Sequence, residues 1–179
     1  MKKLKGLTLI EVVITFAILI IIMGILFPSF ISSYRGFNKT TVKSDLQHDA
    51  ERIIRDITKI AMEAEKVSSI DGADIGETST VYKIDGITKK NIQFTSGSRF
   101  VAEKAEINGF EVNTGILYRV PIYPVAPKIS IGENLEYIEV APLDGVKFKD
   151  SMGIKITIVM KKKDIEYSMS DIVYFRNKK

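Results

Sequence analysis

Cysteine is absent from this 179-residue chain, and histidine occurs once, at position 48. Without thiols the fold has no disulfide, so the hydrophobic core alone must hold it together, and thiol-based metal or redox chemistry is excluded. One imidazole with no cysteine and no second histidine makes neither a zinc site nor a Ser-His-Asp triad. We therefore expect His48 to be a solvated side chain on the polar side of a helix.

Other signatures of catalysis are missing as well. The sequence contains no glycine-rich phosphate loop and no nucleophile elbow. Asp71, Asp74 and Glu77 could offer oxygen ligands to Ca²⁺, but their spacing matches no EF-hand, which favours a solvated or helix-capping loop. The sequence therefore predicts a protein that is not an enzyme and has no cofactor.

The chain carries little excess charge once its first residues are set aside. Of 26 basic side chains, Lys2, Lys3 and Lys5 lie before Gly6, which leaves 23 basic against 22 acidic residues. A nucleic-acid footprint needs basic residues clustered on one face, so overall charge does not argue for one.

The most basic cluster in the later part of the chain is Lys161, Lys162 and Lys163. A solubilising hairpin turn is one interpretation. The sharper alternative is a contact with DNA or another polyanion, although Asp164 and Glu166 beside the cluster dilute its field.

The first thirty residues hold a disproportionate share of the apolar side chains. Residues 7–27 form a run of about twenty residues with Glu11 as the single charge, and a helix of this length spans the roughly 30 Å hydrocarbon layer. The run is too long for a secretory signal peptide, and no A-x-A site follows it. Because lysines precede it, the positive-inside rule places Met1 in the cytoplasm and the rest of the chain outside.

Glu11 separates this segment from a plain membrane anchor. A carboxylate in an apolar helix costs about 2 to 3 kcal/mol unless it is paired or lies near the interface. Cleavage after Gly6 would create an α-amino group on Leu7, a cation suited to pair with a carboxylate in the same apolar layer. Within one helix Leu7 and Glu11 are a turn apart, so we expect the pair to form between staggered neighbouring chains.

The residues K-G-L-T-L-I-E, followed by an apolar helix, resemble the type IV pilin and type II secretion pseudopilin superfamily. The resemblance implies that a prepilin peptidase cleaves after Gly6 and N-methylates Leu7, where the family usually has Phe. It also places the family's assembly glutamate at Glu11 and its helix-kinking proline at Pro28. Proline lacks a backbone N–H, so it bends or interrupts a helix.

The same resemblance implies the partners and the location. They are the prepilin peptidase, sibling pilin or pseudopilin subunits that pack through the N-terminal helix, an inner-membrane assembly platform, and membrane lipid before assembly. The chain would be a single-pass membrane protein that ends in a cell-surface filament. A pilus, a secretion pseudopilus and a DNA-uptake apparatus all remain open, with a filament-borne adhesin or DNA-binding subunit as the alternative function.

Beyond residue 38 a second periodicity begins. Apolar residues recur every three or four positions, which predicts an amphipathic helix facing a core: Val42, Leu46, Ala50, Ile53, Ile57, Ile60, Ala64 and Val67. Residues 68–79 read as a loop, and short runs rich in Val, Ile, Tyr and Phe follow as strands. The last forty residues predict a meander of at least three antiparallel strands, and a short strand is also expected at residues 146–148. Residues 94–113 are left unassigned.

We therefore expect an α+β, pilin-like fold in which a long N-terminal helix packs on an antiparallel sheet. Its expected parts are a cleaved leader, a transmembrane and assembly helix, a polar turn with an amphipathic helix, and a β-rich head, over residues 1–6, 7–28, 29–69 and 70–179. The closing pattern of strands resembles the head of the larger minor pilins, the J-type or W-type subunits, which favours a minor over a major subunit.

Overall fold

A computed structural model of the chain describes residues 8–85, 90–107, 110–121 and 127–178. Its long helix α1 (Leu9–Glu63) is followed by strands alone, apart from one short 3-10 turn. The chain divides into two compact units, residues 1–41 and 42–179, which are described separately below.

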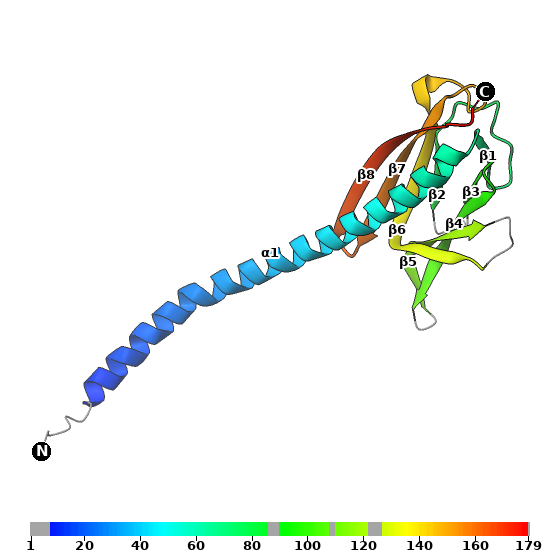
Figure 1. Cartoon of the computed structure of the whole chain (residues 1–179). Coiled ribbons are helices and arrows are strands. Elements are labelled where there is room, and N and C mark those ends of the chain that lie inside the picture. Colours follow the sequence, from blue (N-terminus) through cyan, green and yellow to red (C-terminus); the bar gives the residue numbers. More distant parts are fainter. Residues whose placement is uncertain (1–7, 86–89, 108–109, 122–126, 179) are drawn as a thin grey trace, which may run out of the picture. The chain divides into compact units, whose positions relative to one another are not determined.

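The first unit consists of the N-terminal part of α1 (Figure 1). Its helix begins after Thr8 and continues through Pro28, so this proline does not interrupt it. The polar turn expected within residues 29–38 is wrong, since these residues are helical. Thr40 and Thr41 instead donate hydroxyl hydrogen bonds to the carbonyl groups of Gly36 and Phe37, which satisfies polar side chains within the helix.

The second unit begins with the C-terminal part of α1, whose apolar stripe packs on the sheet (Figure 1). The predicted periodicity is confirmed within the helix, because its buried residues recur every three or four positions: Leu46, Ala50, Ile53, Ile54, Ile57, Ile60 and Ala61. The helix ends earlier than predicted, at Glu63, so Ala64 and Val67 are buried beyond it, Val67 as the first residue of a strand. The last carbonyls of the helix are satisfied by distant segments. Ser96 Oγ donates to Ile60 O, Arg176 N to Met62 O and Asn177 Nδ2 to Glu63 O.

Eight strands form one curled antiparallel sheet in the described part of the chain (Figure 1). They are β1 (Val67–Ile70), β2 (Tyr82–Asp85), β3 (Asn91–Phe94), β4 (Ser98–Ile107), β5 (Phe110–Pro121), β6 (Ile129–Pro142), β7 (Gly153–Lys162) and β8 (Ile165–Tyr174). The order is β1-β3-β4-β5-β6-β7-β8, and β2 pairs with β6 off this path. The predicted closing meander is confirmed as β6, β7 and β8.

Two local predictions for the β-rich part differ from the structure, and a segment that was left unassigned is regular. The expected loop at residues 68–79 begins with the last residues of β1, and the unassigned residues 94–113 contribute to the β4–β5 pair. The expected strand at residues 146–148 is irregular, because this segment instead joins an earlier loop. Phe148 N donates to Thr78 O, and the Phe148 ring is buried 6.0 Å from the ring of Tyr82. The predicted α+β class itself is confirmed.

Gly153 controls the approach of β7 to β8, which gives a test of this hairpin. A Cβ at position 153 would lie 2.2 Å from the carbonyl oxygen of Val173, a backbone atom that cannot move aside alone. We expect Gly153→Ala to lower the free energy of unfolding by about 1 to 3 kcal/mol, measured by urea unfolding of the full chain in detergent. Ser168→Ala, exposed on the same hairpin, should change it by no more than about 0.5 kcal/mol. Equal midpoints for the two variants would contradict the assigned contact.

Candidate functional site

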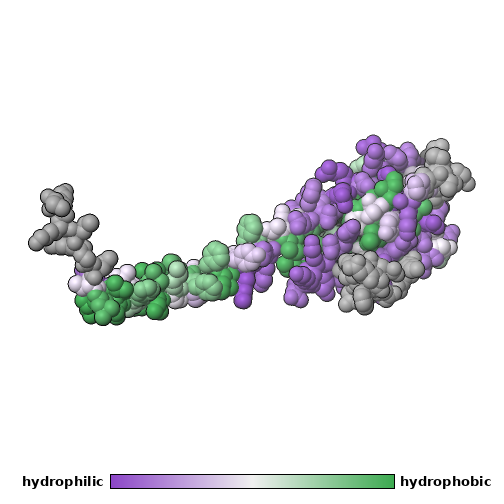
Figure 2. All heavy atoms as spheres, turned by 90° about the horizontal axis from the view of Figure 1, so that it is seen from below, coloured by the Kyte–Doolittle hydropathy of each residue, from purple (hydrophilic) through white to green (hydrophobic). Residues whose placement is uncertain are grey.

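The most distinctive surface of the chain is the apolar segment, defined as residues 9–30 of α1. Its large hydrophobic side chains are exposed, with exposed fractions between 38% at Val12 and 82% at Leu9. Figure 2 shows these apolar residues, in green, gathered along the N-terminal part of the helix. Among the described residues one helix is long and apolar enough to cross a membrane, and its most apolar window is wholly exposed. Such a surface needs a lipid or protein cover.

Glu11 lies in the first turn of this segment and forms a capping box with Thr8. Thr8 precedes the helix, and its carbonyl oxygen accepts the first helical hydrogen bond from Val12 N at 3.3 Å. The Thr8 hydroxyl oxygen accepts a hydrogen bond from Glu11 N at 3.4 Å, while Thr8 N donates to Glu11 Oε2 at 2.8 Å. The reciprocal pair satisfies backbone donors that the helix start leaves free.

This capping box leaves part of the Glu11 carboxylate available. Both hydrogen bonds from Thr8, through N and Oγ1, go to the same oxygen, Oε2. No cation among the described residues lies within salt-bridge distance of Glu11. The carboxylate therefore has a local partner for its hydrogen bonds and no partner for its charge within the described part of the chain.

Of the residues predicted for processing and for bending the helix, the structure describes only Pro28. Gly6 and Leu7, the predicted cleavage and methylation positions, are outside the described residues. Pro28 lies inside α1, nineteen residues past its start, at a position where the helix loses one backbone donor. A kink at Pro28 stays a prediction.

Lys161, Lys162 and Lys163 are at the tip of the β7–β8 hairpin. Lys161 and Lys162 end β7, and Lys163 adopts a left-handed conformation with φ 56° in the turn. Lys161 Nζ lies 3.9 Å from a carboxylate oxygen of Glu136, so one of the three charges is partly compensated. This placement agrees with the hairpin-turn interpretation, and the polyanion contact stays a prediction.

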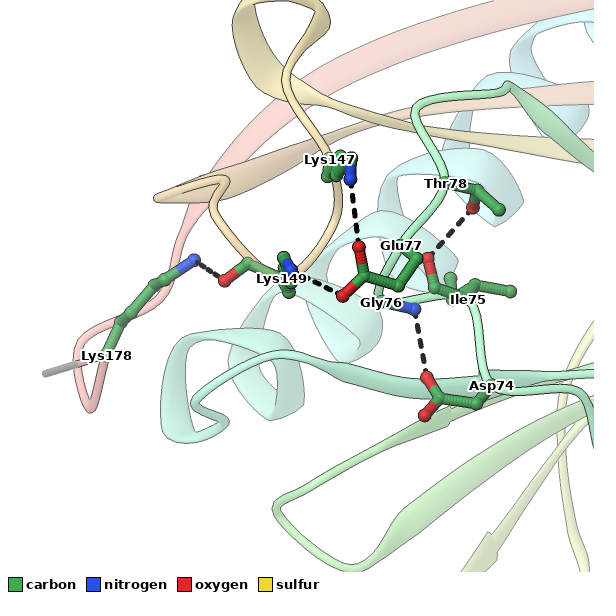
Figure 3. A network of polar contacts seen from close by, with 8 residues as sticks. All are labelled: Asp74, Ile75, Gly76, Glu77, Thr78, Lys147, Lys149 and Lys178. Carbon is green, nitrogen blue, oxygen red and sulfur yellow. Dashed lines mark hydrogen bonds and ion pairs between the residues drawn. The ribbon is translucent and has the colours of Figure 1, made fainter.

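Glu77, in the acidic loop, is paired with two lysines (Figure 3). Glu77 receives hydrogen bonds from Lys147 Nζ at 2.9 Å and from Lys149 Nζ, one on each carboxylate oxygen. Asp74 Oδ1 accepts the backbone N–H of Gly76 at 2.9 Å. The search for clusters of metal-ligating side chains finds none among the described residues. His48 is exposed on α1, as expected.

These contacts form what we call the lysine clasp, the ion pairs of Glu77 with Lys147 and Lys149. The two ammonium groups lower the pKa of the Glu77 carboxyl to about 2, and its hydrogen bond raises the pKa of Lys149. Lys178, near the C-terminus, donates to the carbonyl oxygen of Lys149 at 2.7 Å. Partial burial lowers the pKa of Lys178. The clasp and the tail thus tie three segments that are far apart in sequence at one end of the sheet.

Two of these features were not predicted from the sequence. The capping box had a signal, because Thr8 and Glu11 have the T-x-x-E spacing that typifies it. The lysine clasp had none, since Glu77 and its two lysines are about seventy residues apart and only the fold brings them together.

Comparison of the chain with protein-family models, with curated proteins and with solved structures finds no match.

The lysine clasp predicts a specific dependence of stability on pH. Because the pKa of Glu77 is lowered from 4.5 to about 2 in the folded chain, its contribution is present above pH 4.5 and is lost as the pH falls toward 2. We expect Glu77→Gln to lower the urea midpoint at neutral pH, with the difference from wild type shrinking over that acid range and at high salt.

The matched control is Glu166→Gln, which removes the same charge from an exposed strand position. A wild-type minus Glu77→Gln difference that stays constant from pH 6 to about pH 2 would contradict the clasp.

Proposed function

We propose that this chain is a pilin-like structural subunit, a larger minor pilin or pseudopilin, which is held in a membrane by its N-terminal helix and then joins a filament. The observation that carries the proposal is Glu11, a carboxylate at the start of an exposed apolar helix that has no cation partner among the described residues. The K-G-L-T-L-I-E sequence around it supports the same conclusion.

The apolar segment has two successive environments in this proposal. Before assembly, lipid covers its side chains, and Glu11 lies near the cytoplasmic interface. In the filament, the helices of neighbouring subunits replace the lipid, and the charge of Glu11 must then be compensated by protein. The α-amino group of a neighbour's Leu7, exposed by cleavage after Gly6, is the cation that the processing step supplies.

The capping box offers a competing explanation for why position 11 is a glutamate. The free energies of capping and of burying the charge help to decide between the two explanations. A helix cap contributes about 0.5 to 2 kcal/mol, and an uncharged Gln at this position can also complete a capping box. A carboxylate in the apolar layer costs about 2 to 3 kcal/mol. The helix dipole favours Glu over Gln in the first turn by about 0.3 to 1 kcal/mol, which is less than the cost of the charge. Pairing with an amine requires the negative charge and offsets that cost.

Processing gives the first test of this function. Gly6→Val should leave the leader attached, because the resemblance assigns cleavage to the bond after this glycine. N-terminal sequencing of the membrane-extracted chain should start at a methylated Leu7 in wild type and at Met1 in the variant. Leu7→Phe, which introduces the family's usual residue, is the control that should still be cut. A wild-type chain that starts at Met1 would refute the proposed processing.

Assembly gives the second test, and two variants separate charge from capping. Glu11→Gln keeps a side chain that can complete the capping box but removes the charge, so we expect it to be processed normally and to be lost from filaments. Thr8→Ala removes the cap and keeps the charge, so it should still enter filaments, with a helix start weaker by about 1 kcal/mol. Incorporation is measured by immunoblotting of sheared filaments, and head folding by urea unfolding.

The opposite pattern has a clear meaning. If Glu11→Gln entered filaments at the wild-type level while Thr8→Ala did not, Glu11 would act as a cap rather than as an assembly charge. If both variants assembled normally, the salt bridge would have no role.

A further inference from the structure

The C-terminal flank of the apolar segment combines aromatic and basic side chains. Phe30, Tyr34 and Phe37 are exposed at 69%, 59% and 70%. Arg35 and Lys39, four residues apart, lie on one face of α1. Tyrosine at the end of an apolar helix is typical of the membrane interface, because its ring is apolar and its hydroxyl is polar.

Arg35 and Lys39 border a shallow groove on the first unit. Pro28, Ser32 and Gly36 line the same groove, and no atom lies within 4 Å of a Cβ added at Gly36. Neither cation lies within ion-pair distance of a carboxylate in the described part of the chain. The groove therefore presents two uncompensated cations, with a serine hydroxyl between them and the apolar segment.

The spacing along α1 places these cations at a defined depth. Twenty-four residues separate Glu11 from Arg35, which at about 1.5 Å per residue is about 36 Å of helix. The hydrocarbon layer is about 30 Å thick. When Glu11 lies at the cytoplasmic boundary, Arg35 and Lys39 therefore lie at the level of the opposite headgroups.

We propose that Arg35 and Lys39 form a binding site for the phosphate of an anionic phospholipid headgroup in the outer leaflet, an inference that rests on the membrane stage of the proposed function. The Arg35 guanidinium matches two phosphate oxygens, and Lys39 adds a second cation one helical turn away. Bound at this depth, the lipid fixes the helix along the membrane normal and keeps Glu11 at the cytoplasmic interface.

A membrane lipid fits this groove better than a neighbouring subunit does. The positive-inside bias concentrates basic residues on the cytoplasmic flank, so two cations on the outer flank need a local reason. The interfacial aromatic residues on the same stretch supply it, since they place the groove at headgroup depth. Acidic side chains of a neighbouring helix are the competing partner, and the experiment below separates the two.

The test measures which lipids contact the full-length chain in phosphatidylcholine vesicles. Trace phosphatidylglycerol or phosphatidylcholine, each with a spin-labelled acyl chain, is added, and electron paramagnetic resonance gives the fraction of each label restricted at the protein surface. We expect wild type to prefer phosphatidylglycerol by about threefold or more. In the Arg35→Gln, Lys39→Gln double variant the preference should fall clearly below that of wild type, to the level that Lys2, Lys3 and Lys5 maintain on the cytoplasmic flank.

The matched control is the Arg55→Gln, Lys59→Gln double variant. It removes two exposed cations with the same spacing from the second unit, and it should keep the preference of wild type. Resistance to carbonate extraction shows that each variant is inserted.

Three outcomes would overturn the inference. A chain inserted and assembled normally but without lipid preference would refute the lipid site and leave the proposed function standing. A double variant that keeps the lipid preference but fails to assemble would assign Arg35 and Lys39 to a subunit contact. A wild-type chain released by carbonate would refute the membrane stage and the lipid site together.

Discussion

The structure depends first on how the apolar surface of α1 is covered. Residues 9–30 expose large aliphatic and aromatic side chains, and the single carboxylate among them, Glu11, has no cation partner in the described part of the chain. Water is a poor solvent for such a surface, so a cover must be found. A lipid bilayer covers the aliphatic part but does not compensate the charge. In the proposed function a second cover, the helices of neighbouring subunits, does both.

The second unit is stabilised independently of that surface. Its core joins the stripe of α1 to the sheet, and the lysine clasp closes one end of it. The clasp is exposed and contributes a salt-sensitive, pH-dependent increment, whereas the buried core supplies most of the stability. Substitutions at Glu11 should therefore change assembly without unfolding this unit.

The sequence predicted helices and strands correctly where apolar residues recur with one regular period. The three- to four-residue repeat from Leu46 to Ile60 and the alternation in β6 to β8 predicted buried helix and strands. The prediction failed where tertiary contacts override local pattern. Residues 146–148 look like a strand but bury Phe148 against Tyr82. Polar composition also failed to distinguish a turn from an exposed helix at residues 29–38, which continue α1. The contacts of Glu77 with Lys147 and Lys149 could not be predicted, because only the fold brings these distant residues together.

The proposed assembly depends on a pair between Glu11 and the Leu7 amine of another subunit. It is tested most directly by solid-state nuclear magnetic resonance on filaments assembled from two pools of chain, one labelled with ¹⁵N-leucine and the other with ¹³C-glutamate. Because the labels are on different subunits, dephasing between the Leu7 α-amine and the Glu11 carboxylate reports the intersubunit distance alone. The account predicts a separation below about 4 Å, the range of a salt bridge. Assembled filaments with no measurable dephasing between these two groups would contradict it.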